Sequence, residues 1–222
     1  MTRAQTPQTR VIKADPEAPE AEAIERAVSV LRTGGVLALP TDTLYGLSAS
    51  LSMTDAIRRI IALKKRDAKK PFILLVGERD WVSRYVKAVT PEAEALMKGF
   101  WPGPLSLILS PQDDLPSEVR ERDGIALRQP SSKLCLSILE LLGEGMVSTS
   151  ANVSGSTPPR TCKEVLRNFE TGIDLVIDGG ISPQALASTV VDVRISPPSI
   201  IREGAIPAQR ITALLKQSRH SA

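Results

Sequence analysis

The densest group of charged residues in the chain is Lys64–Lys70, which places five cations within seven residues. Lys64 continues the isoleucine stripe of a helix predicted over residues 53–66, so its stem leaves the inward face and its ammonium should reach a cleft. The run ends before Pro71 and an apolar segment, which indicates that the cations lie at the edge of a sheet. Such a cluster suits a polyanion such as a triphosphate, and a solvated charged loop is the ordinary alternative.

Two polar segments, residues 40–47 and 148–152, offer hydroxyl and amide groups at predicted strands. In an extended segment, alternate side chains share one face. The side chains that would share a face are Thr41, Thr43 and Tyr45 in the first segment, and Ser148, Ser150 and Asn152 in the second. Because α/β proteins commonly bind ligands just beyond buried strands, these groups are candidate ligand contacts. Turn formation and a capped strand end are the competing interpretations.

Several other catalytic chemistries fit the sequence poorly. The only histidine, His220, lies in a polar segment near the C-terminus, which argues against a Ser-His-Asp hydrolase, a Cys-His protease or a His-ligated zinc enzyme. Cys135 and Cys162 form neither a disulfide framework nor a CxxC pair. Since no GxxxxGK[ST] motif occurs, a nucleotide would not be held by a P-loop. The chemistry must therefore use lysine, arginine, hydroxyl, amide or carboxylate groups.

The composition is typical of one globular domain. The 222 residues are 42% hydrophobic and 24% charged, and 28 basic against 25 acidic residues give a net charge of +3. This mild excess does not by itself identify a nucleic-acid-binding protein. No apolar run approaches the roughly 18 residues of a membrane span, and the N-terminus lacks the apolar core of a secretory signal. We therefore expect a cytoplasmic protein that does not interact with membranes.

Predicted helices and strands alternate along most of the chain. Residues 1–20 are predicted as a flexible N-terminal extension, residues 21–216 as one domain and residues 217–222 as a polar tail. Ser52 and Asp55 resemble a capping box at the start of the helix over residues 53–66. Helices are predicted over residues 21–33, 53–66, 81–89, 91–100, 133–142, 161–169 and 206–216, and strands over residues 36–40, 72–77, 105–109, 125–128, 146–150, 175–178, 188–193 and 199–202. This order indicates an α/β fold with a mixed sheet.

Seven segments, taken in order, carry a resemblance to a known family. They are PTDTLYGL, the Lys-x-Arg of KKR with its following KP, WPGPLSLIL, IALRQP, STSANVSG, STVVD and IREGA. Together they resemble the YrdC/TsaC family of L-threonylcarbamoyladenylate synthases over about residues 20–206. The resemblance implies an α/β, YrdC-like single domain, in which helices flank a twisted mixed parallel/antiparallel sheet with a basic concave cleft.

The same resemblance implies an activity. Members of this family combine L-threonine, bicarbonate and ATP into L-threonylcarbamoyl-AMP and release pyrophosphate, which is the first step of threonylcarbamoyladenosine modification in tRNAs that read ANN codons. Mg²⁺ is expected to accompany ATP and to be held mainly by phosphates and water. The implied partners are the proteins that transfer the threonylcarbamoyl group to tRNA, and weak binding of tRNA itself is a further expectation.

Site residues follow from the matching motifs. By that likeness the catalytic residues around the triphosphate and the reacting carboxylate are Lys64, Arg66, Ser150 and Asn152, with Lys70 and Arg202 as further ATP contacts. The implied threonine contacts are Thr43, Arg128, Ser148 and Ser188, and Arg128 suits a carboxylate because a guanidinium can bind it bidentately. The sequence departs from the family pattern at Asp67, Leu75, Ser106 and Ser148.

Two other functions stay open from the sequence. A non-catalytic RNA-binding module could use the same basic concave surface, although aromatic residues make up only 3% of the chain and offer few platforms for base stacking. A relative that transfers a carbamoyl group to a different acceptor could use the same fold. Pyrophosphate release, substrate omission and a salt titration of tRNA binding would separate these functions.

Overall fold

The strands of the molecule form one mixed sheet. The computed structural model describes residues 9–65, 72–120, 123–184 and 186–220, so the predicted ligand contacts Arg66 and Lys70, and the departure Asp67, lie outside the described residues. Within these ranges ten strands are ordered β1-β8-β2-β3-β7-β4-β6-β5-β9-β10. They are β1 (Arg10–Lys13), β2 (Leu37–Pro40), β3 (Tyr45–Ser50), β4 (Ile73–Leu75), β5 (Leu105–Leu109), β6 (Ile125–Arg128), β7 (Met146–Ser150), β8 (Leu175–Asp178), β9 (Thr189–Asp192) and β10 (Ser199–Arg202).

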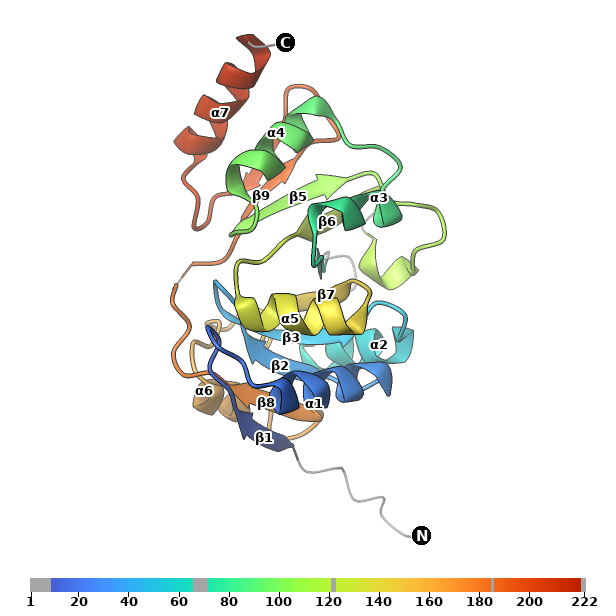
Figure 1. Cartoon of the computed structure of the whole chain (residues 1–222), viewed down its shortest axis with the longest axis vertical. Helices are drawn as coiled ribbons and strands as arrows, with labels where there is room; N and C mark the ends of the chain where they lie inside the picture. Colours follow the sequence, from blue (N-terminus) through green and yellow to red (C-terminus); the bar gives the residue numbers. More distant parts are fainter. Residues whose placement is uncertain (1–8, 66–71, 121–122, 185, 221–222) are drawn as a thin grey trace.

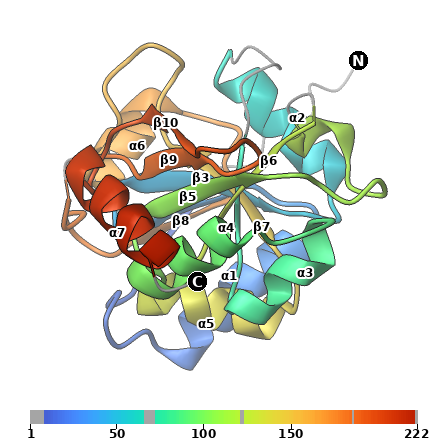
Figure 2. The ribbon, with the colours of Figure 1, turned by 90° about the horizontal axis from the view of Figure 1, so that it is seen from above.

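Helices cover both faces of this sheet. In the described part of the chain they are α1 (Ala21–Arg32), α2 (Thr54–Leu63), α3 (Val82–Tyr85), α4 (Pro91–Phe100), α5 (Lys133–Leu142), α6 (Cys162–Asn168) and α7 (Ala208–His220), with short 3₁₀ helices η1 (Arg79–Trp81) and η2 (Ser117–Val119). In one half of the molecule α1 and α5 lie together on one face of the strands, and α2 and α6 lie on the other (Figures 1 and 2). In the other half α4 packs against α7. The expected fold of a mixed sheet flanked by helices is confirmed.

The two halves of the sheet meet where β7 pairs antiparallel with β4. On one side of this junction lie β1, β8, β2, β3 and β7, and on the other lie β4, β6, β5, β9 and β10, stacked along the long axis in Figure 1. The pairs β1–β8, β2–β8, β4–β6 and β5–β9 are parallel, and the others are antiparallel. Residues far apart in the sequence therefore face one another across the junction.

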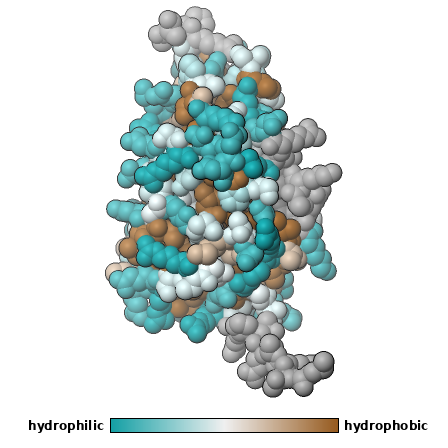
Figure 3. All heavy atoms as spheres, turned by 90° about the vertical axis from the view of Figure 1, so that its right-hand side faces the viewer, coloured by the Kyte–Doolittle hydropathy of each residue, from teal (hydrophilic) through white to brown (hydrophobic). Residues whose placement is uncertain are grey.

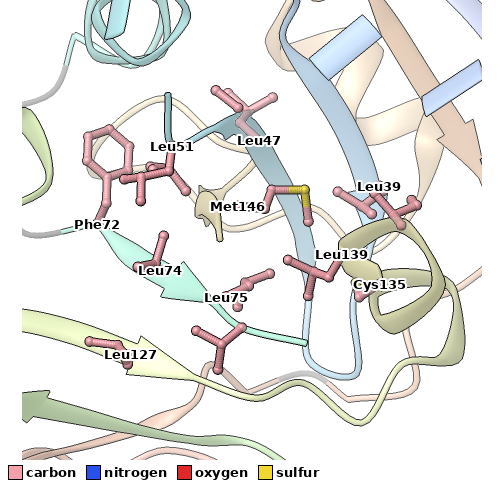
Figure 4. Close-up of a cluster of buried hydrophobic side chains, with 14 of the residues drawn as sticks. Leu39, Leu47, Leu51, Phe72, Leu74, Leu75, Leu127, Cys135, Leu139 and Met146 are labelled. Atoms are coloured by element: carbon pink, nitrogen blue, oxygen red, sulfur yellow. The ribbon is translucent and has the colours of Figure 1, made fainter. Parts of the chain in front are cut away.

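The hydrophobic core runs through this junction without a break. Leu74 and Leu75 of β4 lie between Leu127 on one side and Met146 and Leu47 on the other (Figure 4). All of these side chains are almost completely buried. Because close-packed side chains have little room to move, the junction holds the two halves in a defined arrangement.

The outer surface is predominantly hydrophilic on the face shown in Figure 3, where apolar areas are separate and small. Among the described residues no helix is long and apolar enough to cross a membrane.

Two strands were not expected from the sequence. Residues 10–13 form β1, which pairs parallel with β8, so the prediction of a flexible extension over residues 1–20 is wrong for this part. A four-residue strand that is mostly exposed has no hydrophobic alternation that a sequence could reveal. It forms because the edge of β8 supplies its hydrogen-bond partners. The second unexpected strand is β3, whose six residues are all buried between β2 and β7. Its small residues gave no apolar alternation to detect.

Several helix boundaries differ from the predictions, and the helix predicted over residues 53–66 ends at Leu63. The expected capping box is absent, because α2 begins at Thr54 without a side-chain cap and the Ser52 hydroxyl donates instead to the Glu144 carboxylate at 2.8 Å. The helix predicted over residues 81–89 ends at Tyr85. The C-terminal helix continues to His220, beyond the domain boundary predicted at residue 216, so the polar residues after it extend a helix instead of forming a tail.

Candidate active site

A cavity with a volume of about 570 Å³ lies at the junction of the two halves. Volumes of several hundred cubic ångströms are typical of small-molecule sites. Its polar lining comprises Thr41, Thr43, Tyr45, Arg128, Ser148, Thr149, Ser150, Ser188 and Arg202. Its apolar lining comprises Leu44, Ile73, Leu75, Ile108, Ala126, Pro158, Ala187, Val190 and Ile201, with Gly46 beside them. The cavity therefore collects residues from β3, β4, β5, β6, β7, β9 and β10.

All four predicted threonine contacts line this cavity. Thr43 precedes β3, Arg128 ends β6, Ser148 lies in β7 and Ser188 precedes β9. They are distant in sequence. The strand order β3-β7-β4-β6-β5-β9 brings them together, with β4 joining the two halves. The sequence-based grouping of these residues is therefore consistent with one shared site.

Arg128 is held by a buried ion pair. Its side chain is 4% exposed, and its Nη2 donates to the carboxylate of Asp42, which is itself buried. Its Nε donates to the main-chain oxygen of Gly103 at 3.1 Å, and its Nη1 donates to the Thr43 hydroxyl at 3.2 Å. A guanidinium has five N–H donors, so these contacts leave donors that can meet a ligand.

The hydroxyl groups of the cavity form connected pairs. Thr41 Oγ1 lies 3.0 Å from Thr43 Oγ1, and Ser48 Oγ donates to Ser148 Oγ at 3.1 Å. Gly46 permits the close approach of β3 to β7, because a Cβ at this position would lie 2.7 Å from Ser148 Oγ. Of the hydroxyl row expected at Thr41, Thr43 and Tyr45, the two threonine hydroxyls lie together at the cavity. The Tyr45 hydroxyl contacts the Gly180 carbonyl instead.

Arg202 supplies a second guanidinium to the same cavity. Its Nε and Nη2 donate to the main-chain oxygen of Ser188 at 3.2 and 2.9 Å, and the Ser188 hydroxyl lies 2.9 Å from that of Ser106. Burial, with the nearby charge of Arg128, lowers the pKa of Arg202. A buried cation with a like charge nearby is stabilised by a bound anion.

Lys64 is buried as its position in the helix stripe predicts, but its ammonium does not line the cavity. The ammonium donates to the main-chain oxygens of Ser150 and Asn152, the latter at 2.6 Å. The Asn152 amide nitrogen in turn donates to the main-chain oxygens of Val153 and Ser156 at 3.0 and 2.6 Å. Of the four residues expected around the triphosphate, Ser150 lines the cavity, Lys64 and Asn152 build the turn behind it, and Arg66 lies outside the described residues.

Tyr45 closes one side of the cavity. Its hydroxyl donates to the Gly180 carbonyl at 2.8 Å and accepts from the Gly179 amide at 3.2 Å. Burial is the main reason that the pKa of Tyr45 is raised to about 12. The hydroxyl therefore stays protonated near neutral pH and anchors the segment between β8 and β9.

Sequence reasoning did not select Asp42 or the apolar lining. A signal for Asp42 was present, since Arg128 ends the apolar segment IALR and a buried guanidinium requires an acidic or carbonyl partner. The apolar lining of Ile73, Ile108 and Val190 carries no such signal, because its members resemble ordinary core residues. Leu75, one of the expected departures from the family pattern, is among the cavity-lining residues.

No group of three or more His, Cys, Asp or Glu residues that could hold a metal ion occurs among the residues that the structure describes.

Comparisons with known proteins show the family of the chain. The family model for Sua5, YciO and YrdC proteins, described as "Telomere recombination", matches residues 29–204. The threonylcarbamoyl-AMP synthase of Pyrococcus abyssi is 34% identical over 197 residues, which are 88% of this chain and 58% of that protein. The chain thus spans less than three fifths of the length of this curated relative.

Solved structures give the same relationship. The structure of P. abyssi Sua5 complexed with L-threonine aligns with a TM-score of 0.89 and 33% identity, covering 93% of this chain and 61% of that one. The structure of YciO from E. coli aligns with a TM-score of 0.84 and 30% identity, covering 91% of this chain and 99% of that one.

Proposed function

Because the chain belongs to the Sua5/YciO/YrdC family, we propose that it synthesises L-threonylcarbamoyl-AMP from L-threonine, bicarbonate and ATP. The observation that carries the proposal is the convergence of Thr43, Arg128, Ser148 and Ser188 on one cavity, in a fold that matches a threonine complex of Sua5. Pyrophosphate is the second product. The reaction is the first step of threonylcarbamoyladenosine modification in tRNAs that read ANN codons.

The chemistry proceeds by two bond-forming steps. The amine of threonine adds to bicarbonate with loss of water and gives a carbamate. A carbamate oxygen then forms a bond to the α-phosphorus of ATP, while the bond from that phosphorus to the bridging oxygen of pyrophosphate breaks. Alignment and charge neutralisation govern this step, and no protein nucleophile is required.

Threonine is assigned to the wall formed by β6, β7 and the segments that precede β3 and β9. Arg128 has N–H donors left for the carboxylate, and the hydroxyls of Thr43, Ser148 and Ser188 can meet the ammonium and the side-chain hydroxyl. The apolar lining, which includes Ile108 and Val190, excludes water from the carbamate.

ATP is assigned to Lys64, Arg66, Lys70, Ser150, Asn152 and Arg202. Arg202 and Ser150 line the cavity, so they can reach phosphate oxygens directly. Lys64 and Asn152 support the turn that presents Ser150, whereas Arg66 and Lys70 lie outside the described residues. Mg²⁺ enters with the nucleotide, held by phosphates and water.

The proposal includes hand-over of the product to proteins that transfer the threonylcarbamoyl group to tRNA in the cytoplasm. A non-catalytic RNA-binding module is the second candidate. The cavity favours the enzyme, because its volume of about 570 Å³ and its apolar lining suit a small molecule better than a nucleic-acid backbone.

Mass spectrometry of the products formed from threonine, bicarbonate and ATP tests the proposal. Threonylcarbamoyl-AMP should appear, and pyrophosphate release should require threonine and bicarbonate together. Equal release without either substrate would contradict the assignment. A product from another carbamoyl acceptor would indicate a related transfer reaction, and salt-sensitive tRNA binding without any product would favour the RNA-binding module.

A further inference from the structure

Asp42 is the carboxylate that faces the buried guanidinium of Arg128, and it does not itself line the cavity. Its side chain is almost completely buried. One carboxylate oxygen accepts from Arg128, and the other accepts from the Ser131 hydroxyl at 3.1 Å. A buried carboxylate with two partners of this kind has a fixed orientation.

The guanidinium of Arg128 joins three separate segments. It contacts Asp42 and Thr43 in the β2–β3 connection and the Gly103 carbonyl before β5, while its own residue ends β6. Asp42 is the only charged partner among these contacts, and removal of one member of a buried ion pair leaves the other member uncompensated. The orientation of Arg128 therefore depends on Asp42.

The contact also reaches the hydroxyl row. Thr43 Oγ1 accepts from Arg128 and lies 3.0 Å from Thr41 Oγ1, and the Thr41 hydroxyl donates to the Leu44 carbonyl at 2.8 Å. A rotation of the guanidinium would break its hydrogen bond to the Thr43 hydroxyl, which would then be held only by Thr41. Asp42 can thus influence the cavity wall from a position behind it.

The charge of the cavity depends on the same residue. Arg128 and Arg202 both line the cavity, and each carries a positive charge. The ion pair with Asp42 compensates Arg128, so Arg202 is left as the cation that attracts a second anionic group. In this arrangement Arg128 and Arg202 can each bind a different anionic group.

We infer that Asp42 is a positioning residue, which holds Arg128 so that it orders Thr43 and directs its remaining donors at the carboxylate of the amino-acid substrate. The nature of that substrate rests on the proposed function. The position of Arg128 itself does not.

The test has one arm without substrate and one with it. In the first arm, NMR of ¹⁵N-labelled protein follows the Arg128 Nε–H signal, which is assigned from its absence in Arg128→Gln. This signal should be protected from solvent exchange in the wild type and lose that protection in Asp42→Asn. Asp192→Asn is the matched control, because Asp192 forms a similar ion pair with Arg194 outside the cavity lining.

In the second arm, Asp42→Asn should raise the threonine KM about tenfold, a typical effect of losing one charge-assisted contact, and leave the ATP KM unchanged. The double variant Asp42→Asn/Arg128→Gln should bind threonine no worse than Arg128→Gln alone, since Asp42 acts through Arg128. Asp192→Asn should leave both KM values unchanged.

An unchanged Arg128 signal in Asp42→Asn would overturn the inference, as would additive effects in the double variant. If the wild type makes no product, the proposed function fails, and the NMR arm still decides whether Asp42 holds Arg128. If Asp42→Asn does not fold, Ser131→Ala replaces it, because this change removes only the hydroxyl that orients Asp42. A smaller loss of protection is then expected, and full protection would overturn the inference.

Discussion

The ammonium of Lys64 lies 2.6 Å from the main-chain oxygen of Asn152. Since it also donates to the Ser150 carbonyl, this cation holds together the turn that follows β7. Its inward direction is predicted by the helix stripe, but its ammonium donates to the main-chain carbonyls of Ser150 and Asn152 and does not line the cavity. Lys64 therefore shapes the site from its rear wall.

Lys64→Ala should reduce both stability and turnover. Hydrogen bonds from a charged donor contribute about 1.5–3 kcal/mol each, so we expect the free energy of unfolding to fall by about 3 kcal/mol. Turnover should fall roughly a hundredfold, because Ser150 loses its fixed position. Urea unfolding and product formation measure the two effects.

The neighbouring cation is the control for Lys64. Lys65 is exposed, and exposed charges are screened by solvent. Lys65→Ala should therefore change neither the free energy of unfolding nor the turnover appreciably. Equal losses in the two variants would show that the run acts as a diffuse charged patch.

Arg202→Gln should raise the ATP KM by about tenfold, because a partly buried cation in the cavity is replaced by a neutral amide. Arg160→Gln is the matched control, since the Arg160 guanidinium also donates to a main-chain carbonyl, that of Ser182 at 3.1 Å, outside the cavity lining. Initial rates over a range of each substrate measure the effect. A rise in the threonine KM alone would assign Arg202 to the amino acid instead.

Gly46→Ala should weaken threonine binding while the fold persists. The added Cβ would lie 2.7 Å from Ser148 Oγ, and the side chain of Ser148 must then turn away from its contact with Ser48. Calorimetric titration with threonine measures the effect, which we expect to be about a tenfold loss of affinity. Gly77→Ala, whose Cβ would lie 3.3 Å from Trp81, tests crowding outside the cavity lining and should bind threonine normally.

Tyr45 should make stability depend on alkaline pH. The pKa of the Tyr45 hydroxyl is about 12 in the folded protein and about 10 in the unfolded chain. Between these values the folded state binds more protons, so the stability contributed by Tyr45 is fully present below pH 10 and is lost as pH rises towards 12.

Tyr45→Phe isolates this effect. The variant should be less stable than the wild type below pH 10, because it loses the contacts to Gly179 and Gly180, and the difference should shrink as pH approaches 12. Chemical unfolding followed by circular dichroism at several pH values measures the difference. A constant difference across this interval would contradict the expected titration of Tyr45.

Much of the secondary structure is determined locally and could be predicted from the sequence. The strands β5, β6, β7, β8 and β10 begin and end where the predictions place them, because each contains consecutive apolar residues beside turn residues. The inward direction of Lys64 is equally local, since it follows from helical periodicity. The residues expected to contact threonine could be named because their motifs resemble those of a family.

The partners of the charged groups were decided only by the tertiary structure. Asp42 and Arg128 are 86 residues apart, and Lys64 meets Asn152 across 88 residues. The burial of β3 also depends on β2 and β7, which close over its small side chains. Local periodicity determines the direction in which a side chain leaves the backbone. The order of strands in the sheet determines which atoms that side chain contacts, and this order depends on the packing of the whole chain.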